Sequence, residues 1–399
     1  MHSQQFLNID RLLSQTVFFW QFSAFHSSDY PWRTTHENLS HWLDGLTLAE
    51  VQELKLAPEK ITQALSVFIP EVHDLYKLSQ LEQLQADPLV TPKGLDSGIN
   101  GRKWQQITNL SALGIQYSQP QEQWLEWCGG KGYLGRVLNV ASGKPVTTLE
   151  WQDALCHSGQ EYADKHHLDM TFIQGDALTK SASELIKPDQ HAIALHACGD
   201  LHVSLIQKGI DKSIDAVTLS PCCFHLTQSS VYEGLSALSK QAQIRLSKED
   251  LRLPLQETVT AGKRTQHHRE QEMQYRLGFN ALQSFVTGNG NYVPVPSIKK
   301  SLLSDGFEAF CLWASEHKKL QLPDDVDFSH WLNKGKEAFV VMEKCDLVQQ
   351  VFKRPLEVWL CLDRVLLLEE AGYNVRIGEF CLKEDTPRNI VIQAKKSVK

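Results

Sequence analysis

A glycine-rich turn beside a carboxylate is the first feature of the sequence that points to chemistry. The stretch LEWCGGKGYLG, residues 125–135, follows a strand-like run and opens a helix. Such a turn lets the backbone approach a ligand closely and aims free helix N–H groups at it. Glu126 stands where an acid faces the amino group of a bound ligand, and Gly130 and Gly132 supply a turn without side chains. Cys128 replaces the first glycine of the usual D/E-x-G-x-G-x-G pattern.

Two further acids extend this site. Glu150 ends the run VTTLE, 18 residues after Gly132, where a carboxylate can accept from both ribose hydroxyls of an adenosyl ligand. Asp176 follows the run TFIQGD and is expected to accept from the adenine amino group. Acids in this order on three consecutive strand ends predict S-adenosylmethionine as the cofactor, and we assign His196 to the same site. A dinucleotide oxidoreductase shares the first two signals but gives no reason for Asp176.

The reacting group is expected beyond the carboxyl ends of the fourth and fifth strand-like runs, because ligands of open α/β sheets bind there. The residues in these places are His196, Cys198, Asp200, Ser220, Pro221, Cys222, Cys223, Phe224 and His225. The interpretation that we prefer is a pocket in which Asp200 or His225 removes a proton from an oxygen or nitrogen nucleophile during in-line transfer.

Three alternatives stay open for the cysteines. A thiolate at Cys222 or Cys223 can add to a pyrimidine ring and activate its carbon. Cys198, Cys222, Cys223 and His225 can bind a metal, but adjacent cysteines lack the x₂–x₄ separation that structural zinc prefers, and we expect no metal. In the remaining case the thiols only pack.

Short apolar runs alternate with helical stretches from about residue 120 to residue 224, which indicates a parallel sheet wound by crossover helices. The final stretch, from Arg354, reads as an amphipathic helix followed by two strands. The predicted fold is therefore α/β: a seven-stranded Rossmann-like methyltransferase sheet in which the last strand inserts beside the fifth.

Other segments surround this sheet. The pattern predicts a helical accessory unit over residues 1–95, the first part of the core over 96–226, an insertion over 227–353 that binds substrate, and the end of the core over 354–399. Before the first strand, the sequence RKWQQITNLSALG predicts a basic amphipathic helix closed by Gly114.

Composition narrows the class of protein. With 42% hydrophobic and 22% charged residues the 399-residue chain is globular, and neither a leader pattern nor 18 uninterrupted apolar residues occur, so we expect a soluble cytoplasmic protein with no membrane contact. Nine cysteines, two of them adjacent, make a poor disulfide framework. A net charge of −7 excludes a general attraction to nucleic acid, so RNA would need a local basic face. The candidates are Arg102 and Lys103, and the cluster Lys263, Arg264, His267, His268, Arg269 and Arg276.

Four stretches resemble a known group of domains. They are EWCGGKGYLG, ALHACGDL, SPCCFHL, and the terminal LDRVLLLEEAGY with TPRN. They resemble the methyltransferase domain shared by methyltransferase-like protein 25, the glutathione S-transferase C-terminal-domain-containing protein and the tRNA 2′-O-methyltransferase of the acceptor stem. The likeness covers about half of the chain, roughly residues 100–230 and 354–399.

This resemblance implies a Rossmann-like methyltransferase that uses S-adenosylmethionine, with RNA as the substrate class. The chain lacks the zinc-finger motifs of the tRNA enzyme. A protein side chain or a small molecule as acceptor, and a non-catalytic module that binds the cofactor, stay open as alternatives. The sequence identifies no obligate protein partner.

Overall fold

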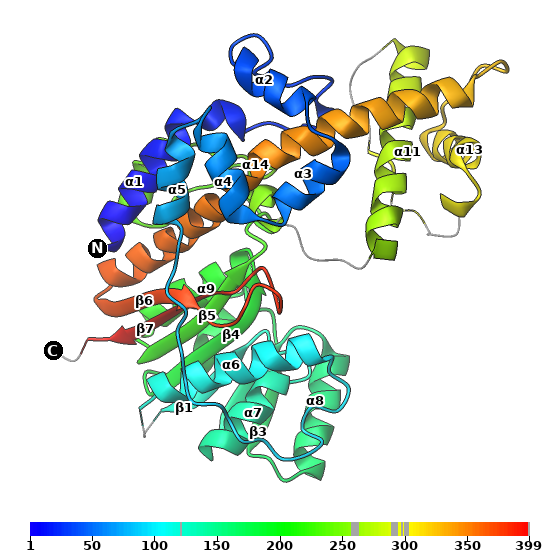
Figure 1. Cartoon of the computed structure of the whole chain (residues 1–399). Coiled ribbons are helices and arrows are strands. Elements are labelled where there is room, and N and C mark those ends of the chain that lie inside the picture. The colour runs from blue at the N-terminus through cyan, green and yellow to red at the C-terminus, as the bar shows by residue number, and fades with distance from the viewer. Residues whose placement is uncertain (120–121, 257–262, 289–293, 297, 299–302, 398–399) are drawn as a thin grey trace. The chain divides into compact units, whose positions relative to one another are not determined.

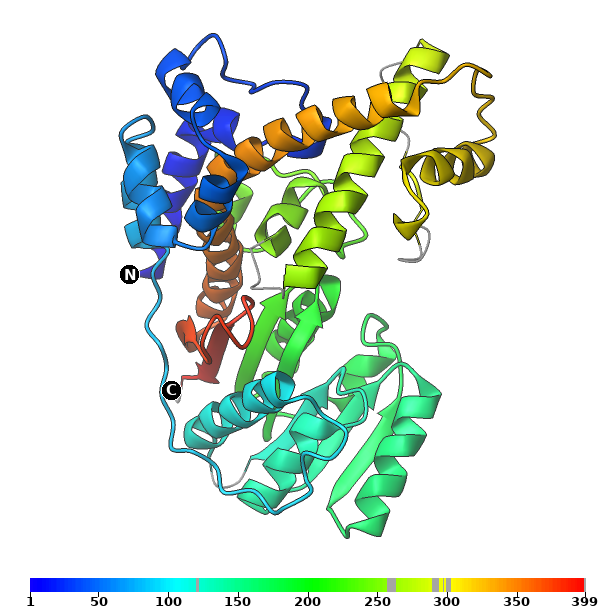
Figure 2. The same ribbon diagram turned by 45° about the vertical axis from the view of Figure 1, so that its right-hand side comes forward.

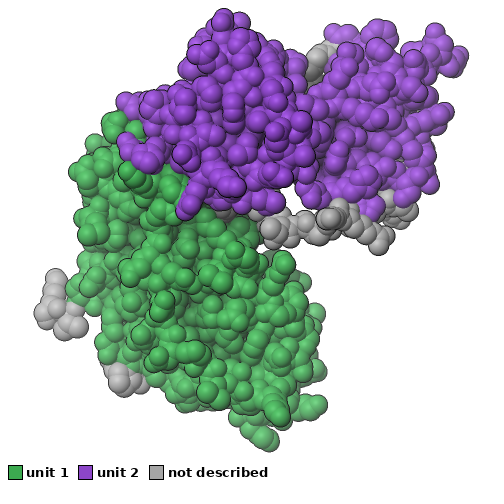
Figure 3. Space-filling model, in the orientation of Figure 1, with its two compact units in different colours: residues 1–14, 75–259, 353–399 green, residues 15–74, 260–352 purple. Residues whose placement is uncertain are grey.

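The computed structural model describes all residues except 120–121, 257–262, 289–293, 297, 299–302 and 398–399. The chain divides into two units, coloured separately in Figure 3. Unit 1 contains residues 1–14, 75–259 and 353–399, and unit 2 contains residues 15–74 and 260–352. Each unit has an apolar core of its own.

Unit 1 is built on a seven-stranded sheet with the strand order β3-β2-β1-β4-β5-β7-β6. The strands are β1 (Gln123–Trp127), β2 (Val146–Glu150), β3 (Met170–Gln174), β4 (Gln190–Cys198), β5 (Ala216–Cys222), β6 (Tyr373–Glu379) and β7 (Ile390–Lys396). Strands β1 to β5 are parallel, and β7 runs antiparallel between β5 and β6. This confirms the predicted α/β fold, including the insertion of the last strand beside the fifth.

Helices wind around this sheet in the order that the alternation predicts (Figure 1). The crossover helices are α7 (Tyr133–Ser142), α8 (Asp153–Lys165) and α9 (Asp200–Asp211), and the short α10 (Ala237–Lys240) follows β5. Because the strand order reverses between β1 and β4, right-handed crossovers place α7 and α8 on one face and α9 on the other. The carboxyl ends of β1 to β5 therefore meet at one edge, where ligands of such sheets bind.

The helix before β1 differs from its prediction. Helix α6 (Gly101–Tyr117) continues past Gly114, so this glycine does not close it. A Cβ atom on Gly114 would lie 3.0 Å from Cδ1 of Ile193 and 3.5 Å from the Trp124 ring. The glycine is thus required by close packing of α6 on the sheet, where Leu110 and Leu113 join the apolar core.

Long-range contacts group the chain differently from the four predicted segments. Asp10 of α1 (His2–Gln15) accepts hydrogen bonds from the backbone N–H groups of Gln243 and Ile244, at 2.8 and 3.4 Å. Leu84, in the extended segment that links the helical N-terminal part to α6 (Figure 2), donates to the carbonyl of Glu379 in β6. The two ends of the predicted accessory unit therefore belong with the sheet in unit 1.

Unit 2 joins the rest of that segment to most of the predicted insertion. Its helices are α2 (Glu37–Asp44), α3 (Leu48–Lys55), α4 (Pro58–Ser66), α11 (Lys263–Thr287) and α13 (Phe307–Lys318), and α5 (Glu71–Leu78) begins in it. Lys55 forms buried ion pairs with Glu343 and Asp346 at 2.8 and 2.6 Å. Burial lowers the pKa of Lys55, but the two carboxylates outweigh it and raise that pKa. The pairs hold α3 against the long helix that carries both carboxylates.

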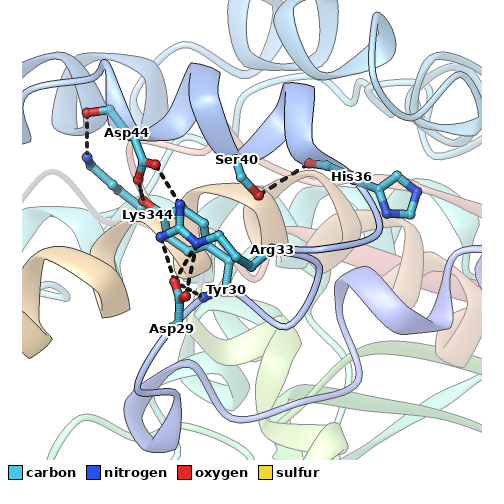
Figure 4. A network of polar contacts seen from close by, with 7 residues as sticks. All are labelled: Asp29, Tyr30, Arg33, His36, Ser40, Asp44 and Lys344. Carbon is cyan, nitrogen blue, oxygen red and sulfur yellow. Dashed lines mark hydrogen bonds and ion pairs between the residues drawn. The ribbon is translucent and has the colours of Figure 1, made fainter.

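A polar network beside α2 is a second connection between the N-terminal helices and the same long helix (Figure 4). The guanidinium of Arg33 forms ion pairs with Asp29 and Asp44, at 2.6 and 2.5 Å, and lies over the ring of Tyr30. Lys344 donates to the carbonyl of Asp44 at 3.3 Å. These last two residues are 300 positions apart in sequence, which explains why no local pattern predicts their contact.

Helix α14 (Phe328–Glu370) spans 43 residues and runs through the predicted boundary near residue 354. Pro355 lies inside the helix without ending it, although proline lacks the N–H for one helical hydrogen bond. The first part of α14 belongs to unit 2 and the last part to unit 1. Among the described residues, no helix combines the length and the apolar character that a bilayer crossing requires.

Candidate functional site

The turn between β1 and α7 packs against the strands beneath it. Cys128, Gly130 and Gly132 have φ values of 57°, 61° and 71°, in the left-handed region that favours glycine. A Cβ atom on Gly132 would lie 2.4 Å from the Phe172 ring, and one on Gly129 would lie 2.5 Å from the carboxyl carbon of Glu126. The turn therefore needs its glycines both for conformation and for close approach.

Glu126 lies beneath this turn. Its carboxylate accepts a hydrogen bond from the Thr148 hydroxyl at 2.8 Å and another from the backbone N–H of Gly135. Burial raises the pKa of Glu126 to about 7, against the effect of these hydrogen bonds. The structure thus shows a carboxyl group that supports the turn, while its contact with a ligand amino group stays a prediction.

Glu150 connects the end of β2 to the turn. Its Oε2 accepts from the N–H of Gly130 at 2.9 Å, and its Oε1 accepts from the N–H of Gln152 at 3.0 Å. Both oxygens are therefore held in place by the backbone, and each keeps a free lone pair for a further donor.

A cavity of about 340 Å³ opens at the carboxyl ends of β1, β2 and β3. Its lining consists of Cys128, Leu149, Glu150, Trp151, Gly175, Asp176, Ala177 and Leu201. Three of the predicted cofactor residues thus share one cavity. Asp176 is held there by a hydrogen bond that its Oδ1 accepts from the N–H of Leu178 at 2.9 Å. The indole of Trp151 is 67% exposed, which leaves a flat aromatic face for a ligand ring.

Cysteines meet at the ends of the next two strands. Cys198 and Cys222 are register partners in β4 and β5, and their Sγ atoms lie 3.6 Å apart. Cys223 has a φ of 51°, and its Sγ lies within 4.8 Å of both others. Hydrogen bonds from Cys198 and Cys222 lower the pKa of Cys223, and the charge of Arg388 acts in the same direction. The three thiols thus share one small region at the ends of β4 and β5.

His196 lies at an irregularity in β4, between Leu195 and Ala197, and has a φ of 60°. The side-chain amide of Gln106 donates to the carbonyl of Asp385, so its Oε1 faces Nε2 of His196 at 2.9 Å. Burial lowers the pKa of His196 to about 3, and Lys103 and Arg388 add to this effect. The imidazole is therefore neutral, with its proton on Nε2. Nδ1 is buried without a partner among the described residues.

The two predicted proton acceptors have different surroundings. Oδ2 of Asp200 accepts from the N–H of Gln228 at 2.9 Å, so this carboxylate holds the loop after β5. Nδ1 of His225 has no hydrogen-bond partner in the described part of the chain. Burial, helped by Arg252, lowers the pKa of His225. Burial therefore favours the neutral form of His225, and its Nδ1 is itself buried.

Some residues of this edge were not assigned to the site from sequence. Gly129 and Thr148 pack directly on Glu126, and Trp151 lines the cavity. Arg388 lies just before β7; its charge acts on the cysteines, and its Nε is buried without a partner among the described residues. An aromatic residue directly after a strand-end acid is a signal that could have identified Trp151.

Only part of the basic cluster in the predicted insertion is available to bind an external anion such as RNA. Arg276 pairs with Glu272 at 2.8 Å and donates to two backbone carbonyls, and Arg269 pairs with Glu343 at 3.3 Å. The side chains of Lys263 and Arg264 lie outside the described residues. Intramolecular carboxylates thus neutralise Arg269 and Arg276.

Comparison with known proteins matches residues 102–230 to a family described as a methyltransferase domain. This segment runs from the start of α6 through the carboxyl end of β5 and so contains the cavity and the cysteines. Residues 102–230 form a Rossmann-like methyltransferase domain. S-adenosylmethionine is the cofactor of this domain class.

The curated relatives are similar over the same region. The glutathione S-transferase C-terminal domain-containing protein of Xenopus laevis is 26% identical over 132 residues, which cover 33% of this chain and 21% of the relative. Its counterpart in Mus musculus is 28% identical over 131 residues, or 32% and 20% of the two chains. The chain therefore spans about a fifth of the length of these relatives.

Among solved structures, the tRNA (uracil-54, C5)-methyltransferase of Pyrococcus abyssi in complex with S-adenosyl-L-homocysteine is 18% identical, with a TM-score of 0.25. The likeness covers 29% of this chain and 28% of that one. An rRNA methylase from Streptococcus thermophilus is 12% identical over 29% of this chain and 71% of that one, also with a TM-score of 0.25.

The residues at the cavity fit S-adenosylmethionine. A Cβ atom built on Gly130 meets nothing within 4 Å, so the turn faces open space at this point. Glu150 and Asp176 offer acceptors for hydroxyl and amino groups, and Trp151 with Leu149, Ala177 and Leu201 offers apolar walls for a flat ring. A nucleoside with hydroxyl and amino donors matches this set of side chains.

Proposed function

We propose that the protein is an S-adenosylmethionine-dependent methyltransferase that acts on RNA. The observation that carries the proposal is the single cavity in which Cys128, Glu150 and Asp176 come together at the ends of three consecutive strands. Sequence likeness to a methyltransferase domain over residues 102–230 supports the same activity. The relatives are matched over only a fifth of their length, so the activity of the whole protein rests on this chain's own residues.

Three residues of the cavity have separate tasks in this proposal. Glu150 accepts from the ribose hydroxyls, because both of its oxygens are already oriented by backbone N–H groups. Asp176 accepts from the adenine amino group, and Trp151 packs on the adenine ring. The bound cofactor supplies an electrophilic methyl group. The next two strand ends, with His196 and the cysteines, then provide the side of the site at which the acceptor binds.

Proton removal from the acceptor is assigned to His225. Its imidazole is neutral at neutral pH and its Nδ1 is unpaired among the described residues, whereas Asp200 is engaged with the loop after β5. A neutral imidazole with a free lone pair can take a proton from an oxygen or nitrogen nucleophile. Methyl transfer otherwise depends mainly on positioning of the two reactants.

RNA as the acceptor class is supported by cations at this edge and by the resemblance to a tRNA enzyme. Arg388 is half-buried and its charge acts at the ends of β4 and β5. Lys103 lies close enough to the cysteines to interact with their charge, and Arg102 beside it is exposed. With a net charge of −7, the chain needs such a local group of cations to hold a phosphate backbone.

The proposal is tested by transfer of a labelled methyl group from S-adenosylmethionine into fractionated RNA, protein and metabolites from cells that lack the protein. We expect label in RNA. His225→Ala should lower kcat about 100-fold, because general base catalysis contributes roughly 10²–10⁴. Its cofactor affinity, measured by calorimetry, should not change. The matched control is His157→Ala, which removes an exposed imidazole from α8.

Three outcomes would change the proposal. Label in the protein or metabolite fraction alone would keep the methyltransferase and overturn RNA as the acceptor. Cofactor binding without label in any fraction would indicate a non-catalytic module. Full activity in His225→Ala would remove this residue from the reaction.

A further inference from the structure

The three cysteines at the ends of β4 and β5 converge although two of them are adjacent in sequence. On a regular strand, successive side chains point to opposite faces, so Cys222 and Cys223 would point apart. The left-handed conformation of Cys223, with a φ of 51°, breaks this alternation. As a result, the Sγ atoms of Cys198, Cys222 and Cys223 all lie within 4.8 Å of one another. The spacing objection to a metal site therefore does not apply to the folded chain.

The separation of the sulfurs matches the coordination of a thiolate-binding ion. A zinc ion lies about 2.3 Å from each thiolate sulfur, and tetrahedral geometry then places two such sulfurs roughly 3.8 Å apart. Cys198 and Cys222 already lie at 3.6 Å. Cys223 lies within about 1 Å of the required position, a shift that a small side-chain rotation provides. The three side chains are thus preorganised for a common ligand.

Neither a disulfide nor simple packing accounts for all of this geometry. A disulfide would join only two of the three sulfurs, and it requires a sulfur separation of about 2.05 Å. The left-handed conformation of Cys223 costs roughly 1–2 kcal/mol and brings its sulfur to the other two, which simple packing does not require. This is the one group of three or more potential metal ligands found in the described part of the chain. Most of the remaining cysteines are buried and belong to no such group.

The surrounding charge suits a bound ion with three thiolates. One divalent cation and three thiolates carry a net charge of −1, which needs a neighbouring positive charge when it is partly buried. Arg388 acts on Cys198 and Cys223, and Lys103 acts on Cys198 and Cys222. Two cations from different elements therefore balance the site.

We propose that Cys198, Cys222 and Cys223 bind a zinc ion at the carboxyl ends of β4 and β5. Thiolates favour zinc over magnesium, calcium or manganese, which prefer oxygen ligands. Three protein ligands leave one position of a tetrahedral ion open, and this is the pattern of zinc sites that act on a bound molecule rather than of closed structural sites. The proposal concerns metal binding and holds independently of the methyl acceptor.

The metal content of the untagged full-length protein, purified without chelators, tests the proposal. Elemental analysis is expected to give about one zinc per chain for the wild type, and much less for Cys198→Ser, Cys222→Ser and Cys223→Ser. The matched control is Cys381→Ser, which removes a buried thiol outside the group and should retain the zinc. Circular dichroism of each variant checks that it is folded.

A second measurement keeps the test independent of the variants. Cobalt(II) added to chelator-treated wild-type protein should give the sulfur-to-cobalt absorption of a thiolate site, and zinc should displace it. Wild-type protein that contains no zinc and gives no such absorption would overturn the proposal, as would zinc retained in all three serine variants. Stoichiometric copper in place of zinc would overturn the choice of ion. S-adenosylmethionine binding, measured separately by calorimetry, shows whether the cofactor site is intact in each case.

Discussion

The two halves of the ligand-binding edge use different chemistry on the same sheet. At the ends of β1 to β3, acids accept hydrogen bonds from backbone N–H groups, as Glu150 does from Gly130. At the ends of β4 and β5, the side chains are thiols and imidazoles, and Nδ1 of His196 and Nδ1 of His225 lack partners among the described residues. The first half is therefore satisfied before a ligand binds, whereas the second half contains groups that a ligand or acceptor would satisfy.

Both halves nevertheless share one backbone feature, a left-handed conformation at residues other than glycine. Cys128, His196 and Cys223 all have left-handed φ values, and each lies at the carboxyl end of a strand or at an irregularity within it. Such conformations persist where the surrounding structure enforces them, and they gather at functional sites. The backbone thus turns in the same way in both halves, while the side chains decide what is bound.

The largest effect is expected from Glu150→Gln, which should weaken cofactor binding in the first half and leave zinc binding in the second half unchanged. Hydrogen bonds to a charged group are worth roughly 1.5–3 kcal/mol each, so we expect about a 100-fold loss of S-adenosylmethionine affinity. Calorimetry measures this loss, and Glu184→Gln, an exposed acid on the same unit, serves as the control. The zinc content should not change. Unaltered cofactor affinity would refute the role of Glu150, and a parallel loss of zinc would show that the halves are not separable.

A smaller effect is expected from the buried acid. The pKa of Glu126 is about 7 in the folded protein, against 4.5 for an exposed glutamate, so the folded state holds its proton more tightly than the unfolded state. The stabilisation that comes from this tighter proton binding at Glu126 is therefore complete below pH 4.5, and it is lost as the pH rises through 7. Glu126→Gln imitates the protonated form. In urea unfolding it should match the wild type near pH 4.5 and exceed it at pH 8, by on the order of 3 kcal/mol.

If the difference in stability between Glu126→Gln and the wild type were the same at every pH, the raised pKa of Glu126 would be refuted. The exposed Glu184→Gln provides the baseline, because its difference from the wild type should stay small across the range.

The smallest effect concerns the one thiol that lies in the acid half. Cys128 occupies a left-handed position where glycine is favoured, so Cys128→Gly should raise the free energy of unfolding by about 1 kcal/mol. Zinc content should be retained, since Cys128 is not one of the three proposed ligands. Thermal unfolding measures the gain in stability, elemental analysis measures the zinc, and calorimetry measures cofactor affinity. A marked loss of cofactor affinity would show that the Cys128 side chain itself contacts the ligand.

The sheet could be predicted from sequence because its signals are local. Apolar runs, the glycine turn and acids at strand ends lie within a few residues of one another, and the class of fold fixes where they meet. The grouping of the rest of the chain could not be predicted in this way. It depends on contacts such as Lys55 with Glu343, which are 288 residues apart and leave no mark on either local pattern.

The candidate site was predictable to different degrees in its two halves. Glu150 and Asp176 follow from their place at strand ends, and the structure brings them to one cavity. The convergence of the thiols depends on the register of β4 with β5 and on the φ value of Cys223, and residue type does not reveal a left-handed conformation in a residue other than glycine. Arg388 could not be assigned from sequence, because its Nε lacks a hydrogen-bond partner among the described residues only as a result of how the whole unit packs.

The position of β7 has a consequence for the order in which the protein assembles. This strand pairs with β5, yet Ser220 and Arg388 at their adjoining ends are 168 residues apart in sequence. During synthesis, the apolar edge of β5 is thus exposed while the ribosome adds the intervening helices, and closing so long a loop slows folding. A nascent chain that has emerged only as far as β5 would offer an unpaired strand to other chains. Chaperone demand should accordingly peak between the synthesis of β5 and that of β7.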